Sequence, residues 1–267
     1  MTRLVIVRHG QAVCNVERTI EGVATCRGLT QLGHQQSIAL GRRLADEGFT
    51  PDVMVASPIR RARETAEHLA SALGGEFLTD PDLEEVRPGE AEGMTWDQYS
   101  AFFGTTEGWD PSVPFAPGAE AWRDFARRAA GAIDRVSPPN EDRTVLVVAH
   151  GGVIDASVFY FFGLDPSVQS PIDFETTNTS ITEWQRRTFT PPATSPVHRW
   201  RLARYNDAAH LPFVVAAPTA VTRPNPMAAG RAESADGARE FDDTYGASRS
   251  MIQPEPAATP SAPPSRR

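Results

Sequence analysis

Two strongly apolar runs in this chain each end in a histidine followed by glycine, and they constrain its fold more than any other feature. Leu4–Val7 leads to His9, and Val145–Ala149 leads to His150. A continuous run of aliphatic residues of this length predicts a strand buried on both faces, as in a parallel sheet. Ligands of open parallel sheets bind at the carboxyl ends of the strands. We therefore expect both histidines at a binding edge, where the following glycine leaves each imidazole accessible.

A third apolar run contributes a cation to the same edge. Asp52–Ala56 predicts a short strand, and Ser57 and Pro58 then suit the N-cap and first turn of a helix that carries Arg60 in that turn. A guanidinium is mildly unfavourable at a helix N-terminus, which attracts anions. An anion bound between Arg60 and the helix end would explain the arginine.

Each of these residues also has an ordinary interpretation. A single histidine after a strand is often a hydrogen-bonded loop residue, and Arg60 alone could be a solvated helix residue. Three strands that each end in a side chain able to bind phosphate are harder to obtain by chance. Together with Arg8, which precedes His9, they favour an anion site, most simply a phosphoryl site.

An ordered set of short motifs resembles the histidine phosphatase superfamily, also called phosphoglycerate mutase-like, from Met1 to about Phe213. The set comprises Arg8, His9, Gly10, Gln11 and Asn15; Leu29, Thr30 and Gly33; Ser57, Pro58, Arg60, Ala62, Thr65 and Ala66; Leu83, Glu85, Gly89, Glu92 and Gly93; His150, Gly151 and Gly152; Asn178–Ile181; and Tyr205–Asp207, His210 and Leu211. No single motif is decisive, but their order is specific.

The resemblance implies a two-step phosphoryl transfer through a phosphohistidine, with neither metal nor cofactor. His9 would attack phosphorus with one ring nitrogen while the other donates to a backbone oxygen. The phosphoryl oxygens would be held by guanidinium groups and the second histidine, because planar charged donors suit them. The residues assigned to substrate binding are Arg8, Asn15, Arg60, His150 and Gly151.

The family pattern assigns the proton donor for the leaving oxygen to Glu85, with Glu84 as the rival. Neighbouring residues of an extended loop point in opposite directions, so only one of the two carboxylates can face the pocket. Both could also belong to a solvated acidic loop. Pro88 and Ala91 stand where relatives often carry an aromatic or another bulky residue, which predicts a more open or differently shaped wall near the acid. The sequence that follows Glu85 resembles the phosphatase branch of the family.

Composition is that of an ordinary enzyme that handles small molecules. The formal net charge is -8 and the arginines are scattered, which argues against a nucleic-acid partner. Cys14 and Cys26 are too few for a disulfide framework, so we expect a reducing cytoplasm, with Cys14 as a small buried side chain. We expect no signal peptide, and no run approaches the ~18 apolar residues of a membrane span. The remaining histidines His34, His68 and His198 show no metal-ligand spacing.

The order of elements predicts an α/β protein, a three-layer αβα sandwich around a mostly parallel sheet. Helices are expected over Gln31–Glu47, Thr95–Phe103 and Glu120–Val136. The α/β domain spans 1–213, with an aromatic insertion at about 86–118. This insertion is either a cap over the catalytic edge or a loop packed on the core. Residues 214–267, rich in Pro and Ala, are expected to be a disordered tail.

Three functions agree with these residues. A phosphomonoesterase that acts on a small phosphorylated metabolite is the first, and a cofactor-dependent phosphoglycerate mutase differs only in the acceptor of the phosphoryl group. The third is a phosphate-binding module without turnover, which would have no need of a nucleophile or an acid. We expect no membrane partner, and a homo-oligomer is compatible with the sequence.

Overall fold

The structure is a computed structural model, and it describes residues 1–104, 110–138, 142–169, 172, 174–190, 195 and 197–211. The tail expected at 214–267, the end of the domain at 213 and Trp109 of the aromatic insertion lie outside the described residues.

A six-stranded sheet forms the centre of the fold. Its order is β3-β2-β4-β1-β5-β6, where β1 is Arg3–Arg8, β2 is Val53–Ala56, β3 is Leu78–Thr79, β4 is Thr144–Ala149, β5 is Ile181–Phe189 and β6 is Val197–Asp207. The first four of these strands pair in parallel, and β5 and β6 are antiparallel additions at one edge. The mostly parallel sheet is therefore confirmed.

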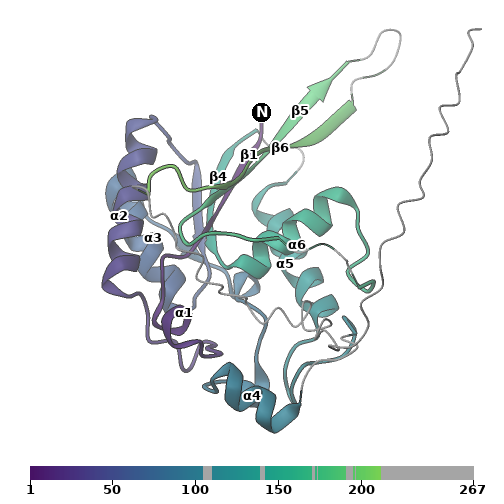
Figure 1. The fold of residues 1–267 in the computed structure, drawn as a ribbon. Helices are drawn as coiled ribbons and strands as arrows, with labels where there is room; N and C mark the ends of the chain where they lie inside the picture. The colour runs from purple at the N-terminus through teal and green to yellow at the C-terminus, as the bar shows by residue number, and fades with distance from the viewer. Residues whose placement is uncertain are drawn as a thin grey trace, which may run out of the picture. The chain divides into compact units, whose positions relative to one another are not determined.

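Helices cover both faces of this sheet, which confirms the layered α/β architecture. On one face lie α2 (Gln31–Asp46) and α3 (Arg60–Leu73), and on the other lie α5 (Trp122–Val136) and α6 (Gly151–Phe162) (Figure 1). Val5 and Val7 of β1 pack against α2 and α3, whereas Leu4 and Ile6 pack against α5 and α6. Strands covered on both sides have no polar face, which explains their continuous apolar runs.

The helix boundaries agree with the sequence to within two residues, and α5 begins at Trp122, two residues after the expected Glu120. Thr30 caps α2 by accepting a hydrogen bond from the Gly33 amide, and Val136 ends α5 as expected. Helix α3, however, begins at Arg60, with Ile59 as its N-cap. The prediction that Ser57 is the N-cap is wrong, because the Ser57 hydroxyl binds another partner, described below.

The aromatic insertion forms a small apolar cluster of its own. It contains the short turn η2 (Gly89–Ala91) and helix α4 (Trp96–Phe103), which lies at the same end of the sheet as α1 (Val13–Glu17) (Figure 1). The short turn η1 (Pro81–Leu83) precedes the insertion. Tyr99 and Ala91 are buried there beside Ile20. Ala91 is fully enclosed, so its small size serves the packing of this cluster.

The antiparallel strands β5 and β6 continue beyond the other strands as a projecting hairpin (Figure 1). The first half of β5 lies against β1, where Ile181 pairs with Val7, and β6 pairs with β5. None of the described helices has the length and apolar character needed to cross a membrane.

Candidate active site

His9 follows β1 directly and is buried, with 4% of its surface exposed. Its Nδ1 lies 2.7 Å from the Gly10 carbonyl oxygen, which can only accept, so Nδ1 carries the hydrogen. The lone pair is then on Nε2, the orientation expected for a nucleophile. Gly10 itself is required for packing, since a Cβ there would lie 2.5 Å from the Gly33 carbonyl oxygen.

His150 lies beside His9, with 5.2 Å between the ring centroids. Its Nε2 is 2.8 Å from the Ser57 hydroxyl, and that oxygen accepts the Ile59 amide at 3.3 Å. The hydroxyl can donate its hydrogen to Nε2, and in that tautomer the ring hydrogen is on Nδ1. Nδ1 is buried without a hydrogen-bond partner in the described structure. Burial, followed by the positive charge of Arg61, holds the pKa of His150 well below its usual range, so the ring is neutral.

The arginine beside the two histidines is Arg61, not Arg60. Arg61 Nε donates to His9 Nε2 at 3.2 Å, and the residue is 4% exposed. Arg60 has 61% of its side chain exposed and pairs with Glu64 at 2.7 Å. The placement of Arg60 at the anion site is therefore corrected. Helix α3 starts later than expected, which turns the next residue inward.

The sequence held a signal for Arg61 in its helical periodicity. The buried residues of α3 are Arg61, Ala62, Thr65, Ala66, Leu69 and Ala70. Arg61 is one turn before Thr65 on this apolar stripe, whereas Arg60 lies one turn before Glu64, outside the stripe. An arginine within an apolar stripe indicates a buried partner.

Arg8 lies close enough for its charge to lower the pKa of His150, after burial and the charges of Arg61 and His9. Its guanidinium donates to the carbonyl oxygen of Thr176, in the segment before β5. Gly151 is the first residue of α6 and is buried.

Asn15 lies in the short helix α1, which follows His9 closely in the chain. Its Oδ1 accepts the Ala12 amide at 2.9 Å and the Asn178 side-chain amide at 3.3 Å. Asn178 Nδ2 also donates to the His9 carbonyl oxygen at 3.0 Å. The carbonyl end of Asn15 is thus used in the fold, and Asn178 connects it to the backbone of His9. Asn178 was part of the motif set, but no pattern in the sequence around it predicts that it lies beside His9.

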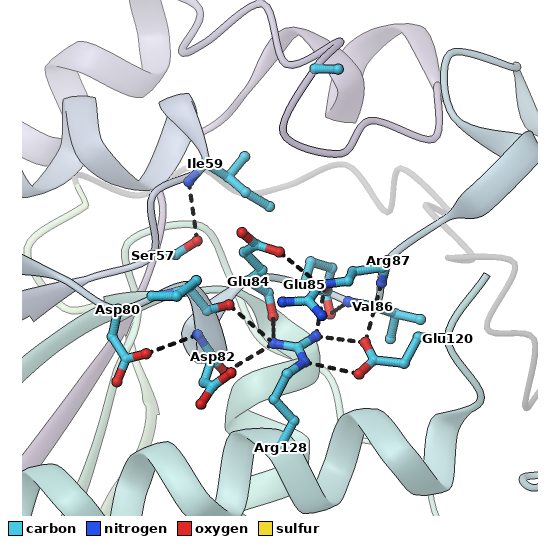
Figure 2. Close-up of polar contacts among 12 residues, drawn as sticks. Ser57, Ile59, Asp80, Asp82, Glu84, Glu85, Val86, Arg87, Glu120 and Arg128 are labelled. Atoms are coloured by element: carbon cyan, nitrogen blue, oxygen red, sulfur yellow. Dashed lines mark hydrogen bonds and ion pairs between the residues drawn. The ribbon is translucent and has the colours of Figure 1, made fainter. Parts of the chain in front are cut away.

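The two acidic neighbours face different partners (Figure 2). Glu85 Oε2 accepts the Gly152 amide at 3.2 Å, one residue into α6 from the end that carries His150. Glu84 Oε2 pairs with Arg87 Nε at 2.9 Å. The structure therefore brings Glu85, and not Glu84, to the N-terminus of α6.

Gly152 makes room for this carboxylate. A Cβ at position 152 would lie 2.1 Å from Glu85 Oε1 and 3.0 Å from Phe125 Cζ. Any side chain there would displace the carboxylate, which explains the second glycine after His150. Sequence reasoning used the glycine as part of a motif but did not find this role, because it depends on a residue far away in the chain.

The described residues contain no group of three or more His, Cys, Asp and Glu side chains placed to hold a metal ion. The site is thus composed of two histidines, two arginines, one carboxylate and backbone amides at the carboxyl edge of a parallel sheet. These features define an α/β protein with a pair of histidines at its candidate active site.

Comparison with known proteins identifies the family. The family model described as the histidine phosphatase superfamily (branch 1) matches residues 4–193. The chain belongs to this superfamily.

The relatives include phosphatases and mutases. The chain is 31% identical over 165 residues to a metal-independent phosphoserine phosphatase of Arabidopsis thaliana, covering 58% of this chain and 67% of the relative. It is 28% identical over 217 residues to a probable phosphoglycerate mutase, GpmB, of Erwinia tasmaniensis, covering 79% and 95%. A solved mycobacterial glucosyl-3-phosphoglycerate phosphatase in complex with VO3 superposes with a TM-score of 0.60 at 29% identity, covering 76% of this chain and 98% of that one.

Proposed function

We propose that this chain is a metal-independent phosphomonoesterase that hydrolyses a small phosphorylated metabolite through a phosphohistidine on His9. The observation that carries the proposal is the His9 ring, whose Nδ1 hydrogen bonds the Gly10 carbonyl while Nε2 faces Arg61. An incoming phosphoryl group would take the Arg61 donor for its own oxygens and leave the Nε2 lone pair to attack. The two free cysteines, Cys14 and Cys26, fit a cytoplasmic protein.

The reaction has two steps. In the first, a bond forms between His9 Nε2 and phosphorus, the bond to the leaving oxygen breaks, and the proton of Glu85 moves to that oxygen. In the second, water attacks phosphorus, its proton moves to Glu85, and the nitrogen–phosphorus bond breaks. Arg8, Arg61 and the Nδ1 hydrogen of His150 supply donors to the phosphoryl oxygens, with Asn15 and Gly151 beside them.

A direct test is to trap the phosphohistidine. Turnover of a labelled ester is stopped with alkali, and the label is expected on the peptide that contains His9. Brief acid treatment should release it, and His9→Ala should lack it. An unlabelled wild type, or a label undiminished in His9→Ala, would disprove the mechanism.

The role of Glu85 is tested with two leaving groups. Glu85→Gln is expected to slow single-turnover transfer from an alkyl phosphate by about a hundredfold to ten-thousandfold, the usual contribution of a general acid. p-Nitrophenyl phosphate needs little protonation of its leaving group, so the loss should be much smaller. Glu84→Gln is the matched control and should change neither rate. Equal losses with both esters would remove Glu85 from this role.

A phosphoglycerate mutase is the second candidate, favoured by the relative named as a probable mutase. A panel of phosphorylated metabolites, assayed for phosphate release and in parallel for bisphosphoglycerate-dependent mutase activity, separates the two. The phosphatase proposal expects phosphate release to dominate. A chain that binds phosphate and turns over no ester would support the binding module instead.

A further inference from the structure

We infer that Arg128 is a positioning residue that fixes the direction of Glu85 by holding the backbone on both sides of it. This inference rests on the role proposed for Glu85 in phosphoryl transfer. Arg128 belongs to α5 and lies outside every motif of the sequence, and its positive charge is, after burial, a minor cause of the lowered pKa of His150. Its guanidinium lies beneath the segment that carries the acid (Figure 2).

The guanidinium donates to four carbonyl oxygens of this segment, of which Pro81 O is the most distant, 3.5 Å from Nη1. Nη1 lies 2.9 Å from Asp82 O and 3.1 Å from Glu84 O, and Nη2 lies 3.3 Å from Glu85 O. The carbonyls of Glu84 and Glu85 belong to the two peptide groups that flank the Cα of Glu85. Because both peptide planes are held, the direction of the Cα–Cβ bond of Glu85 is held as well.

The same donors complete the turn η1. The last carbonyls of a short helix have no partner within it, and Asp82 O is one of these. Water could satisfy such oxygens, but a planar fork of donors also fixes their direction. The segment is therefore oriented by one rigid group.

Glu120 holds Arg128 in place. Its carboxylate accepts Arg128 Nε at 2.9 Å and Nη2 at 2.6 Å, and only 10% of the Arg128 side chain and 13% of the Glu120 side chain are exposed. The guanidinium also stacks on Phe125, with its carbon 5.2 Å from the ring centroid. The Glu120 amide donates to the Arg87 carbonyl at 2.8 Å, which fastens the far end of the same segment.

The carboxylate end of Glu85 is held from the opposite side by α6, through the Gly152 amide. The backbone of Glu85 is thus fixed by α5 and its side chain by α6, two helices that pack on each other. A displacement of about 1 Å in a catalytic group can cost on the order of a hundredfold in rate. Loss of the Arg128 fork should therefore appear as partial loss of general-acid catalysis.

The test compares Arg128→Lys with Arg127→Lys. Lysine keeps the positive charge beside Glu120, but a single ammonium cannot reach carbonyls on both sides of Glu85. Arg127 is the matched control on the same helix, since 62% of its side chain is exposed and its acidic neighbour Asp124 is 3.8 Å away. Single-turnover rates are measured with p-nitrophenyl phosphate and with the alkyl phosphate that the wild type cleaves fastest.

Arg128→Lys is expected to lose about tenfold to a hundredfold with the alkyl ester and less than threefold with p-nitrophenyl phosphate. Arg127→Lys should match the wild type with both. Arg128→Met, which also leaves Glu120 without its cation, should show the same dependence on the leaving group and a lower melting temperature. Equal losses with the two esters, or a wild-type rate in Arg128→Lys, would overturn the inference.

A double variant separates this inference from the proposed function. If Arg128 acts through Glu85, Arg128→Lys should cost less than about twofold further in a Glu85→Gln background, because residues that act as a unit are not additive. A fully multiplicative loss would show that Arg128 acts elsewhere. If Glu85→Gln alone loses no rate with the alkyl ester, the proposed role of Glu85 as the acid is wrong. The inference about Arg128 is then wrong for that reason, and not because Arg128 fails to hold the segment.

Discussion

At the scale of single residues, the site depends on which atom of each side chain is already engaged. His9 uses Nδ1 on the Gly10 carbonyl, and His150 uses Nε2 on the Ser57 hydroxyl. In the proposed mechanism, His9 Nε2 and His150 Nδ1 are therefore the nitrogens that meet the phosphoryl group. A neutral His150 can donate one hydrogen there without a proton being taken up.

The neighbouring arginines of α3 provide a sharp test at this scale. Arg61→Met should lower kcat/KM by a factor of about a hundred or more, because it removes a buried cation from the developing phosphoryl charge. Arg60→Met removes only an exposed ion pair and should stay within twofold. Steady-state kinetics on both variants decide it. A larger loss in Arg60→Met than in Arg61→Met would restore the assignment that the sequence suggested.

Gly152→Ala tests whether the Glu85 carboxylate needs the space that the missing side chain of Gly152 leaves. The new methyl would overlap Glu85 Oε1, so we expect transfer from an alkyl phosphate to fall by about a hundredfold, close to the effect of Glu85→Gln. Gly131→Ala in α5 is the control. Its Cβ would meet Arg135 Nη1 at an ordinary 3.7 Å, and helix propensity should stabilise the fold by roughly 1 kcal/mol. Wild-type transfer in Gly152→Ala would show that the carboxylate does not need this position.

At the scale of secondary-structure elements, the sequence predicted most of what periodicity and capping determine. The apolar runs became β1, β2 and β4, and α4 begins at Trp96, one residue after the expected start at Thr95, which is its N-cap. The predicted start of α3 was too early. Serine is a preferred N-cap residue, but in the fold the Ser57 hydroxyl binds His150. The tertiary contact with His150 overrides the local N-cap preference of Ser57, and no local sequence pattern predicts that contact.

The same limit explains the missed site residues. Arg61 was recoverable from its own helix, because periodicity is a local signal. Arg128, Gly152 and Asn178 were not, since each acts on a residue that is distant in the chain. Their partners are Glu85 for the first two and His9 for the third.

The hypothesis that the aromatic insertion covers the catalytic edge can be tested by destabilising its helix α4. Thr95 and Gln98 form a reciprocal capping box, in which the Thr95 hydroxyl accepts the Gln98 amide at 3.1 Å. Thr95→Ala should destabilise the protein by about 1 kcal/mol. If α4 helps to select substrate, the ratio of kcat/KM between a bulky and a small phosphate ester should also change. A variant of lower melting temperature with an unchanged ratio would favour simple packing of the insertion.

At the scale of the whole molecule, the site joins the first strand to the last segment before β5. The Thr179 amide donates to the carbonyls of Arg8 and His9, and Thr179 itself has a φ of 61°, which is unusual for a β-branched residue. His210 secures it, with Nε2 2.9 Å from the Thr179 hydroxyl. The order around His9 therefore depends on contacts that form only when the entire described fold has assembled.

This dependence predicts a fall in stability with acid. Burial, and then the charge of Arg43, lowers the pKa of His210 to about 4 from an ordinary value of 6.5. Between these values the unfolded chain binds a proton that folded His210 does not, so the free energy of unfolding decreases as the pH falls through this window. Buried His150 acts in the same direction.

Melting temperatures at pH 7.5, 6 and 5 measure this effect. The wild type should lose stability progressively from about pH 6.5 downward. His210→Gln lacks the titrating ring, so its melting temperature should start lower at pH 7.5 but decline less between pH 7.5 and 5. The remaining slope in this variant comes in part from His150. An equally steep decline in His210→Gln would show that the proton uptake that destabilises the fold occurs at another group.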